Sequence, residues 1–140
     1  MNNIYVISTG RNAGDFVVNC IESVKTQTLL PTEHMIIDDM SDDNTRDILM
    51  NYLGSGEYSC LNIRFSSVRK YRLLNLYEYI TTKDPEDIVC IVDSDDWLAH
   101  DDVLKVVKSK FESDEKLEYV YSRYSLSTGE EGGSSRIYDG

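Results

Sequence analysis

Acidic residues crowd the segment from Asp93 to Asp96, which makes it the part of the chain best suited to chemistry. The apolar run at 88–92 precedes it without polar alternation, so it predicts a strand buried on both faces, as in a parallel sheet. Ligands of open α/β sheets bind at the carboxyl ends of the strands, and carboxylates this close together repel one another unless a cation or strong donors neutralise them. Asp93, Asp95 and Asp96 are therefore candidate ligands of Mg²⁺ or Mn²⁺, held jointly with a diphosphate. The alternative from the same residues is an acidic turn that caps the next helix.

Length, charge and cysteine content limit the class of protein. A chain of 140 residues is long enough for one domain with a core and too short for two. Its net charge of −11 argues against non-specific binding to nucleic acid and against docking on anionic lipid. No run is long enough to span a membrane, and the N-terminus lacks the pattern of a secretory signal. With three scattered cysteines and no Cys-x-x-Cys pair, the sequence predicts a reduced, cytoplasmic protein without a disulfide framework or zinc site.

Hydrophobic periodicity predicts strands and helices in alternation. The predicted strands are 4–7, 34–37, 61–65, 88–92 and 117–124. The third alternates with polar residues and is expected to be half-buried or at a sheet edge. The apolar faces of the intervening helices are predicted at Phe16, Val17, Cys20, Ile21 and Val24, at Ile48, Leu49, Tyr52 and Leu53, at Leu73, Leu74, Tyr77 and Ile80, and at Val103, Leu104, Val107 and Phe111. This order predicts a three-layer α/β/α domain with a mostly parallel sheet over residues 1–124, followed by a polar tail or loop at 125–140.

Isolated histidines and cysteines are placed by their surroundings. Cys20 and Cys90 lie in apolar stretches and are expected to be buried small residues. His34 and His100 stand alone and are expected at the solvated surface. No role in chemistry is assigned to these four residues.

A second acidic pair, Asp38-Asp39, closes the predicted strand at 34–37. The prediction puts this pair and the cluster from Asp93 to Asp96 at the ends of consecutive parallel strands, so both are expected to face one site. The chain has no Gly-x-Gly-x-x-Gly motif and no Walker-type loop, which excludes the usual dinucleotide and P-loop sites. Phosphates would then be held by a metal ion and by side chains.

Three stretches, in a fixed order, resemble glycosyltransferase family 2, the inverting enzymes of the GT-A fold. The stretches are 20–28 (CIESVKTQT), 36–45 (IIDDMSDDNT) and 92–96 (VDSDD). The resemblance covers residues 4–124 and is to the N-terminal, nucleotide-sugar-binding half of the family. It implies a GT-A (Rossmann-like nucleotide-diphospho-sugar transferase) fold and a nucleotide sugar as ligand, with a UDP-linked sugar favoured.

The resemblance also implies roles for individual residues. Thr9 would lie against the base, and Arg11 would replace an aromatic residue that often stacks there. Asp39 would accept a hydrogen bond from the base, the contact that favours uracil, and Arg69 would lie near the base or the diphosphate. In the Asp-x-Asp motif, Asp93-Ser94-Asp95, the first Asp would meet the ribose or a metal-bound water and the last would ligate Mn²⁺ or Mg²⁺. Ser94 would also contact the nucleotide.

Some positions depart from the family pattern. Met40 stands where the family usually has Gly, so the loop after Asp39 must turn without the most permissive residue. The family's Ala-Arg-Asn segment is Leu73-Leu74-Asn75 here, and Arg72 is expected to be a solvated surface charge. Asp38 is expected to orient its loop. No catalytic base is assigned, because the late acids do not match the family's base motif; these acids are Glu130, Glu131 and Asp139.

The function predicted from these features is that of a metal-dependent inverting glycosyltransferase, in which a hydroxyl of a glycan or another acceptor attacks the anomeric carbon of a nucleotide sugar. A truncated or degenerate protein that binds nucleotide without turnover is the first alternative. The second is a receiver-like signalling domain phosphorylated at Asp93, although the first strand lacks the acidic pair and the fifth lacks the Lys of that class. The third is a calcium-stabilised structural domain, although the chain has no EF-hand motif. The sequence leaves homo-oligomerisation open.

Overall fold

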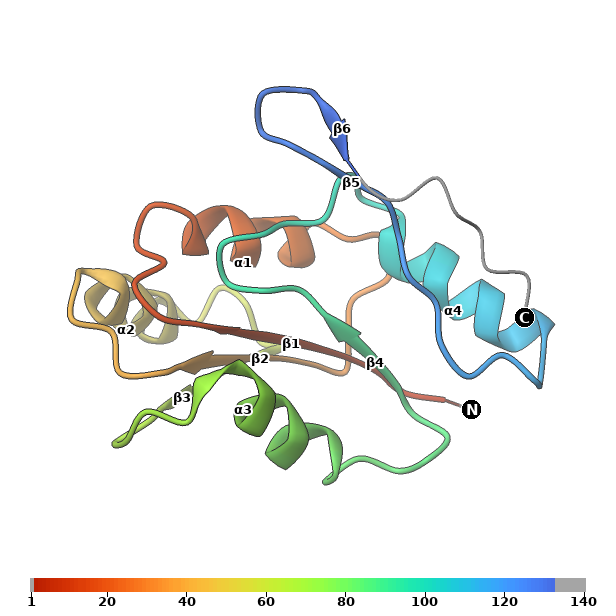
Figure 1. Cartoon of the computed structure of the whole chain (residues 1–140), viewed down its shortest axis with the longest axis horizontal. Helices are drawn as coiled ribbons and strands as arrows, with labels where there is room; N and C mark the ends of the chain where they lie inside the picture. The colour runs from red at the N-terminus through yellow and green to blue at the C-terminus, as the bar shows by residue number, and fades with distance from the viewer. Residues whose placement is uncertain (1, 133–140) are drawn as a thin grey trace.

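The computed structural model describes residues 2–132, and its framework is a four-stranded parallel sheet (Figure 1). The strands lie in the order β3-β2-β1-β4. Their bounds are Ile4–Gly10 for β1, Glu33–Asp38 for β2, Leu61–Phe65 for β3 and Ile88–Ile91 for β4. The helices are α1 at Val17–Lys25, α2 at Thr45–Ser55, α3 at Tyr71–Ile80 and α4 at Val103–Ser113. None of the helices within residues 2–132 combines the length and the apolar composition needed to cross a bilayer.

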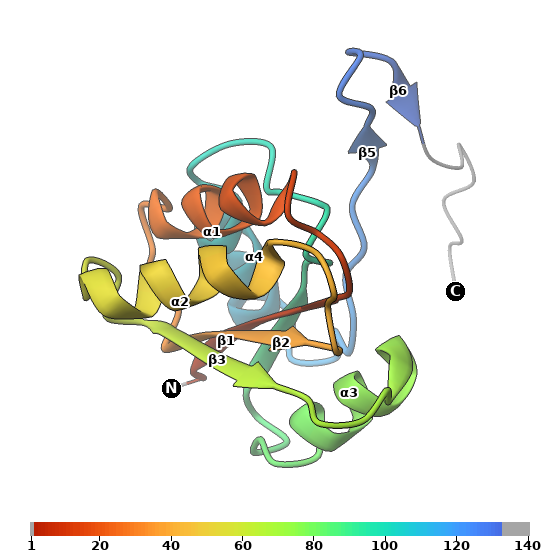
Figure 2. The same cartoon turned by 90° about the vertical axis from the view of Figure 1, so that its left-hand side faces the viewer.

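Helices cover both faces of the sheet, so the predicted three-layer α/β/α architecture is confirmed. Helices α1, α2 and α4 lie on one face, and α3 lies alone on the other (Figure 2). Strand residues alternate between the two faces: Val6 and Ile36 belong to the larger core with α1, whereas Ile7 and Ile37 pack with α3. All four side chains are almost completely buried, and burial of this apolar surface is the main contribution that stabilises the sheet.

Of the burial predictions for the two edge strands of the sheet, the one for β3 is confirmed and the one for β4 is not. β3 is an edge strand with partly buried residues, as its polar alternation predicted. The prediction that 88–92 is buried on both faces is wrong, because within residues 2–132 β4 pairs only with β1, and Ile91 is 46% exposed. The predicted strand at 117–124 is also wrong, since only its last residue is in a strand. A strand needs a partner edge as well as suitable composition, and 117–123 pairs with no strand in the part of the chain that the structure describes.

The segment after α4 contains a small hairpin rather than a plain loop. β5 (Tyr124–Ser125) and β6 (Glu131–Gly132) pair in antiparallel fashion, apart from the main sheet. Gly129 turns the hairpin with φ of +88°, a conformation that favours glycine. The predicted polar tail at 125–140 therefore begins inside a hairpin, and residues 133–140, with Asp139, lie outside the described residues.

Helix α3 buries a different face from the predicted one. Leu73 and Tyr77 of the predicted stripe are 79% and 66% exposed. The buried residues of the helix are Asn75, Leu76 and Tyr79. Because α3 has apolar side chains on most of its circumference, periodicity alone does not determine which side faces the sheet. Its rotation is set instead by its first residues, whose backbone N–H groups are held by Asp39.

One polar residue of the core was expected at the surface. His34 is completely buried on β2, so that prediction is wrong, whereas His100 is exposed as predicted. Nε2 of His34 lies 2.9 Å from Oγ of Ser8, which in turn lies 3.3 Å from Sγ of the buried Cys20. A polar side chain is tolerated inside a core when it has such a hydrogen-bond partner. Cys20 is buried as predicted, and Cys90 is partly buried.

Met40 turns the chain directly after Asp38-Asp39, and its φ is +63°. This left-handed conformation costs a residue with a Cβ atom roughly 1 kcal/mol, whereas glycine adopts it freely. The Met40 side chain is 42% exposed and contributes little packing. We therefore expect Met40→Gly to raise the free energy of unfolding by about 0.5 kcal/mol, after allowance for the greater freedom of glycine in the unfolded chain. Urea denaturation measures this change.

Met40→Ala is the matched control for this prediction. Alanine removes the same side chain beyond Cβ and keeps the left-handed strain, so the free energy of unfolding should stay the same or fall. A Met40→Gly protein that is no more stable than Met40→Ala would show that the loop is not strained at this residue.

Candidate functional site

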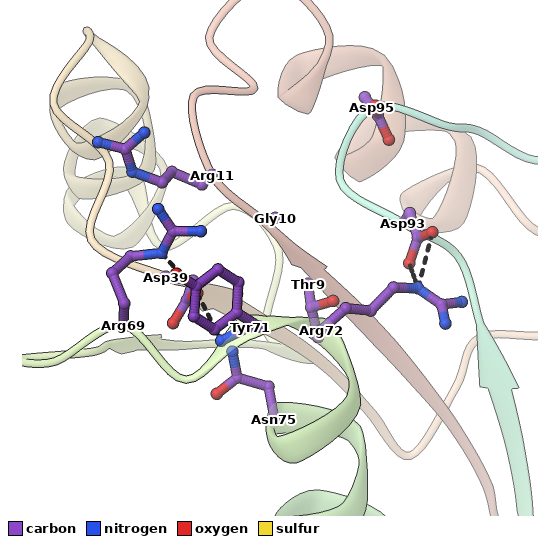
Figure 3. A pocket seen from close by; sticks show the side chains of 10 residues that line it. All are labelled: Thr9, Gly10, Arg11, Asp39, Arg69, Tyr71, Arg72, Asn75, Asp93 and Asp95. Carbon is purple, nitrogen blue, oxygen red and sulfur yellow. Dashed lines mark hydrogen bonds and ion pairs between the residues drawn. The ribbon is translucent and has the colours of Figure 1, made fainter.

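A cavity of about 270 Å³ opens at the carboxyl end of β1 (Figure 3). The residues that line it are Thr9, Gly10, Arg11, Asp39, Arg69, Tyr71, Arg72, Asn75, Asp93 and Asp95. The sheet extends to β2 and β3 on one side of β1 and to β4 on the other, so the cavity lies at a topological switch point, where open α/β sheets bind ligands. The two acidic segments follow β2 and β4, which flank β1 and are not neighbours in the sheet. The structure nevertheless brings Asp39, Asp93 and Asp95 to one cavity, as the sequence predicted.

Asp39 joins the end of β2 to the start of α3. Its carboxylate accepts hydrogen bonds from the backbone N–H groups of Lys70 and Tyr71, each at 2.9 Å, and from Nε of Arg69 at 3.1 Å. Burial favours a higher pKa for this carboxyl, but the hydrogen bonds outweigh burial and keep the pKa below its ordinary value. Asp39 is therefore ionised at neutral pH and holds the N-terminus of α3 beside the cavity.

The first residue of α3 is strained. Tyr71 has φ of +61°, which is uncommon for an aromatic residue. The guanidinium carbon of Arg69 lies 4.4 Å from the centre of the Tyr71 ring, within the range of a cation–π contact. This contact and the ion pair with Asp39 together position Arg69 in the cavity lining. Tyr71 had no predicted role, because hydrophobic periodicity does not indicate such a backbone conformation.

Two buried polar side chains of the lining have no hydrogen-bond partner among residues 2–132. They are the hydroxyl of Thr9 on β1 and the amide of Asn75 on α3. Thr9 is 3% exposed and Asn75 is 0% exposed. Buried polar groups are nearly always paired, so these two groups can bond to a polar ligand or to water in the cavity. Asn75 had no predicted role, although an amide within an otherwise apolar helix could have indicated one.

The end of β1 and the turn after β4 approach closely at Gly10 and Ser94. A Cβ atom on Gly10 would lie 2.8 Å from Cβ of Ser94, so a larger residue would force a shift. The N–H of Ser94 donates to the carbonyl oxygen of Thr9 at 3.1 Å, and Ser94 is 3% exposed. Ser94 is thus packed against β1 and is not part of the cavity lining. Its predicted contact with a nucleotide stays a prediction.

The turn after β4 presents its acids in different directions. Asp93 and Asp95 line the cavity, whereas Asp96 does not. Nε of Arg72 donates to both carboxylate oxygens of Asp93, at 2.9 and 3.0 Å (Figure 3). Arg72 is exposed, as expected, and it is also ion-paired in the cavity lining, which the expectation of a solvated surface charge did not include. The sequence contains an indication of this position, because Arg72 stands three residues before Asn75 and so lies on the same side of the helix.

The donor set of this turn suits a metal ion that is shared with phosphates. Within residues 2–132, no group of three or more His, Cys, Asp or Glu side chains is arranged to hold a metal by itself. Asp93 and Asp95 can supply one or two carboxylate ligands, the number that Mg²⁺ takes from a protein when phosphates complete its shell. The pKa of Asp96 is raised, first by burial and then by the charges of Asp95 and Asp93. Asp96 as a further ligand stays a prediction.

Arg11 lines the cavity but is bound to the loop after β2. Its Nη2 donates to Asp42 at 2.7 Å, and the side-chain amide of Asn12 donates to the same carboxylate at 2.7 Å. These contacts, Asn12 first and then Arg11, lower the pKa of Asp42. Asp38 accepts hydrogen bonds from the backbone and the hydroxyl of Ser41, which agrees with its expected role in orienting this loop. The loops after β1 and β2 are thus tied together at the edge of the cavity.

Comparison with known proteins gives a family and a fold. The model of glycosyl transferase family 2 matches residues 5–135. Residues 1–349 of TarS from S. aureus, solved in complex with UDP-GlcNAc, superpose with a TM-score of 0.64 at 20% identity, covering 81% of this chain and 32% of that one. The mannosyltransferase PcManGT from Pyrobaculum calidifontis, solved in complex with GDP-Man and Mn²⁺, superposes with a TM-score of 0.62 at 20% identity, covering 73% of this chain and 30% of that one.

The solved structures show the fold of the chain, and the chain covers only part of each of them. At such identities, the two solved structures show a shared fold, the α/β fold of GT-A glycosyltransferases. The chain spans about a third of the length of these two solved chains. No curated protein matches the sequence significantly.

Proposed function

The chain belongs to glycosyl transferase family 2, and on this premise we propose that it transfers a sugar from a UDP-linked donor to a hydroxyl group of a glycan or another acceptor, with a divalent metal ion and with inversion at the anomeric carbon. The GT-A fold supports the same reaction class. One observation carries the proposal: at the switch point of the sheet, three carboxylates line the same cavity as two buried polar groups that are unpaired within residues 2–132.

The nucleotide would bind on the side of the cavity formed by β1, β2 and α3. A carboxylate accepts about four hydrogen bonds, and Asp39 already accepts from Lys70, Tyr71 and Arg69. The remaining position suits the N–H of uracil, which lies between two carbonyl groups. The Thr9 hydroxyl, which is unpaired within residues 2–132, and the Asn75 amide, which lies close enough to Asp39 to help lower its pKa, would then bond to those carbonyls.

Asp93 and Asp95 would hold the metal ion at the other side of the cavity, together with the diphosphate. Bound there, Mg²⁺ or Mn²⁺ would stabilise the negative charge that develops on the departing UDP. The protein itself has a net charge of −11, which repels a nucleotide. Arg69 and Arg72 place positive charge in the lining and so reduce this repulsion where the donor binds.

The free cysteines are relevant to the cellular compartment of the protein. Cys20, Cys60 and Cys90 are all free in the structure. Free thiols are typical of a reducing compartment, which supports a cytoplasmic location.

Titration calorimetry with UDP, with and without Mn²⁺, tests the proposed function. We expect the protein to bind UDP at least about tenfold more tightly with Mn²⁺ than without it. Asp95→Asn is expected to lose this gain, because a carboxamide is a weaker ligand for a hard cation than a carboxylate is. Asp47→Asn makes the same chemical change at an exposed position in the first turn of α2 and should bind UDP as the unaltered protein does.

The outcomes separate the proposed function from its alternatives. A protein that binds UDP with Mn²⁺ but neither transfers nor hydrolyses the sugar of a UDP-linked donor would be a nucleotide-binding protein without turnover. Weaker binding of GDP than of UDP would support the role given to Asp39. Failure to bind UDP under any metal condition would overturn the proposal.

A further inference from the structure

Arg72 covers one of the two candidate metal ligands. Nε of its guanidinium donates to both carboxylate oxygens of Asp93, at 2.9 and 3.0 Å. The two terminal amino groups have no partner within residues 2–132, and Figure 3 shows them turned away from Asp93. The Arg72 side chain is 56% exposed and that of Asp93 29%, so the ion pair can open without disturbing the core.

The other charged residues of the lining differ from Arg72 and Asp93 in their partners. Asp39 is paired with Arg69, and Arg11 is paired with Asp42 outside the lining. Asp95 makes no ion pair in the part of the chain that the structure describes. A cation bound between Asp93 and Asp95 would therefore meet the guanidinium of Arg72 at the same oxygens, and like charges at that separation repel strongly.

We propose that Arg72 is an internal counter-ion, which neutralises Asp93 when no metal ion is bound and moves to the diphosphate when metal and donor bind. The inference rests on the proposed function, because it requires a metal–diphosphate complex at Asp93 and Asp95. A guanidinium binds two phosphate oxygens at once through its planar fork. The diphosphate would thus replace Asp93 as the anionic partner of Arg72 when the metal ion binds to Asp93.

This exchange makes metal and donor binding interdependent. A metal ion that binds alone must displace Arg72 and leave it without a partner, so it binds weakly. When UDP binds as well, both Asp93 and Arg72 are paired, so each ligand tightens the binding of the other by the same factor. Arg72 is thus a positioning residue that favours the fully loaded site over a site that holds metal only.

Two titrations on the same variants test the exchange without any measurement of turnover. The first follows free Mn²⁺ by electron paramagnetic resonance as the metal is added alone, and the second follows UDP binding by calorimetry at saturating Mn²⁺. Arg72→Gln is expected to bind Mn²⁺ alone about three- to tenfold more tightly, because Asp93 is free, and to bind UDP about tenfold more weakly. Arg72→Lys keeps the charge without the fork and should be intermediate in both titrations.

Lys105→Gln is the control for net charge, since Lys105 is exposed on α4, on the opposite face of the sheet from α3 (Figure 2). It should change neither affinity. Opposite changes in the two titrations of Arg72→Gln support the exchange, because loss of a purely structural residue would weaken both and lower the unfolding temperature. If Arg72→Gln binds both Mn²⁺ and UDP more weakly, or if neither affinity changes, the exchange is overturned. The proposed function is still supported in that case, provided that the unaltered protein binds UDP. No UDP binding by the unaltered protein overturns both.

Discussion

Asp39→Asn is expected to lower the free energy of unfolding by about 3 kcal/mol, measured by urea denaturation at neutral pH. The Asp39 carboxylate is 4% exposed and accepts from the N–H groups of Lys70 and Tyr71 and from Arg69. Asparagine keeps the shape of the side chain but has one oxygen and no charge. Its amide would turn two further N–H groups toward donors that need an acceptor, at the positive end of the helix dipole.

The same substitution is expected to abolish UDP binding even under conditions in which the variant is folded. Asp39 fixes the start of α3, and α3 carries Arg72 and Asn75 into the cavity lining. Loss of this anchor therefore displaces groups on both the nucleotide side and the metal side of the site. Calorimetry at low temperature, with folding checked by circular dichroism, measures this effect.

Asp47→Asn provides the comparison for stability. Asp47 is exposed in the first turn of α2, so its neutralisation should cost less than about 0.5 kcal/mol. If Asp39→Asn cost no more than that, the N-terminus of α3 would have to be held by other contacts, and the rotation of the helix would need another explanation.

The parts of the site that were predictable from the sequence are those that follow from the ends of strands. Asp93 comes directly after an apolar run, and Thr9 and Asp39 come one residue later, after Ser8 and Asp38. The carboxyl ends of parallel strands lie at one edge of a sheet whatever the order of the strands. The structure places all three in the lining of one cavity, as the strand-end argument predicted for the two acidic segments, although the burial predicted for β4 was wrong. The prediction of a shared site depends on the direction in which the strands run and not on which strands are neighbours.

The parts that were missed depend on contacts between distant segments. Arg72 and Asn75 reach the cavity because α3 turns Asn75, Leu76 and Tyr79 inward. Both sides of this helix are apolar, so hydrophobic periodicity favours neither. The hydrogen bonds that decide between them join Asp39 to residues about thirty positions later, at separations of 31 and 32. Such a contact has no local signature in the sequence.

His34 was missed for the same reason, and its burial leads to a second large effect. Burial lowers its pKa from 6.5 to about 3. In the pH range between these values the unfolded chain binds a proton that the folded chain does not, so stability is fully present above pH 6.5 and is lost as the pH falls toward 3. Between pH 7 and pH 5 we expect the free energy of unfolding to fall by about 2 kcal/mol from this residue alone. Urea denaturation at a series of pH values measures the slope.

The surroundings of His34 explain why the folded protein cannot accommodate the charge. Nε2 lies 2.9 Å from Oγ of Ser8, and Nδ1 has no partner within residues 2–132. The Tyr58 ring, 6.0 Å away between centres, is tilted against the imidazole, and no acidic side chain forms an ion pair with it in the described chain. His34→Gln is therefore expected to remove the pH dependence between pH 7 and pH 5, whereas His100→Gln, which changes an exposed histidine, should retain it. A slope that persists in His34→Gln would assign the proton uptake to carboxylates instead, and the buried imidazole would then be stable in its charged form.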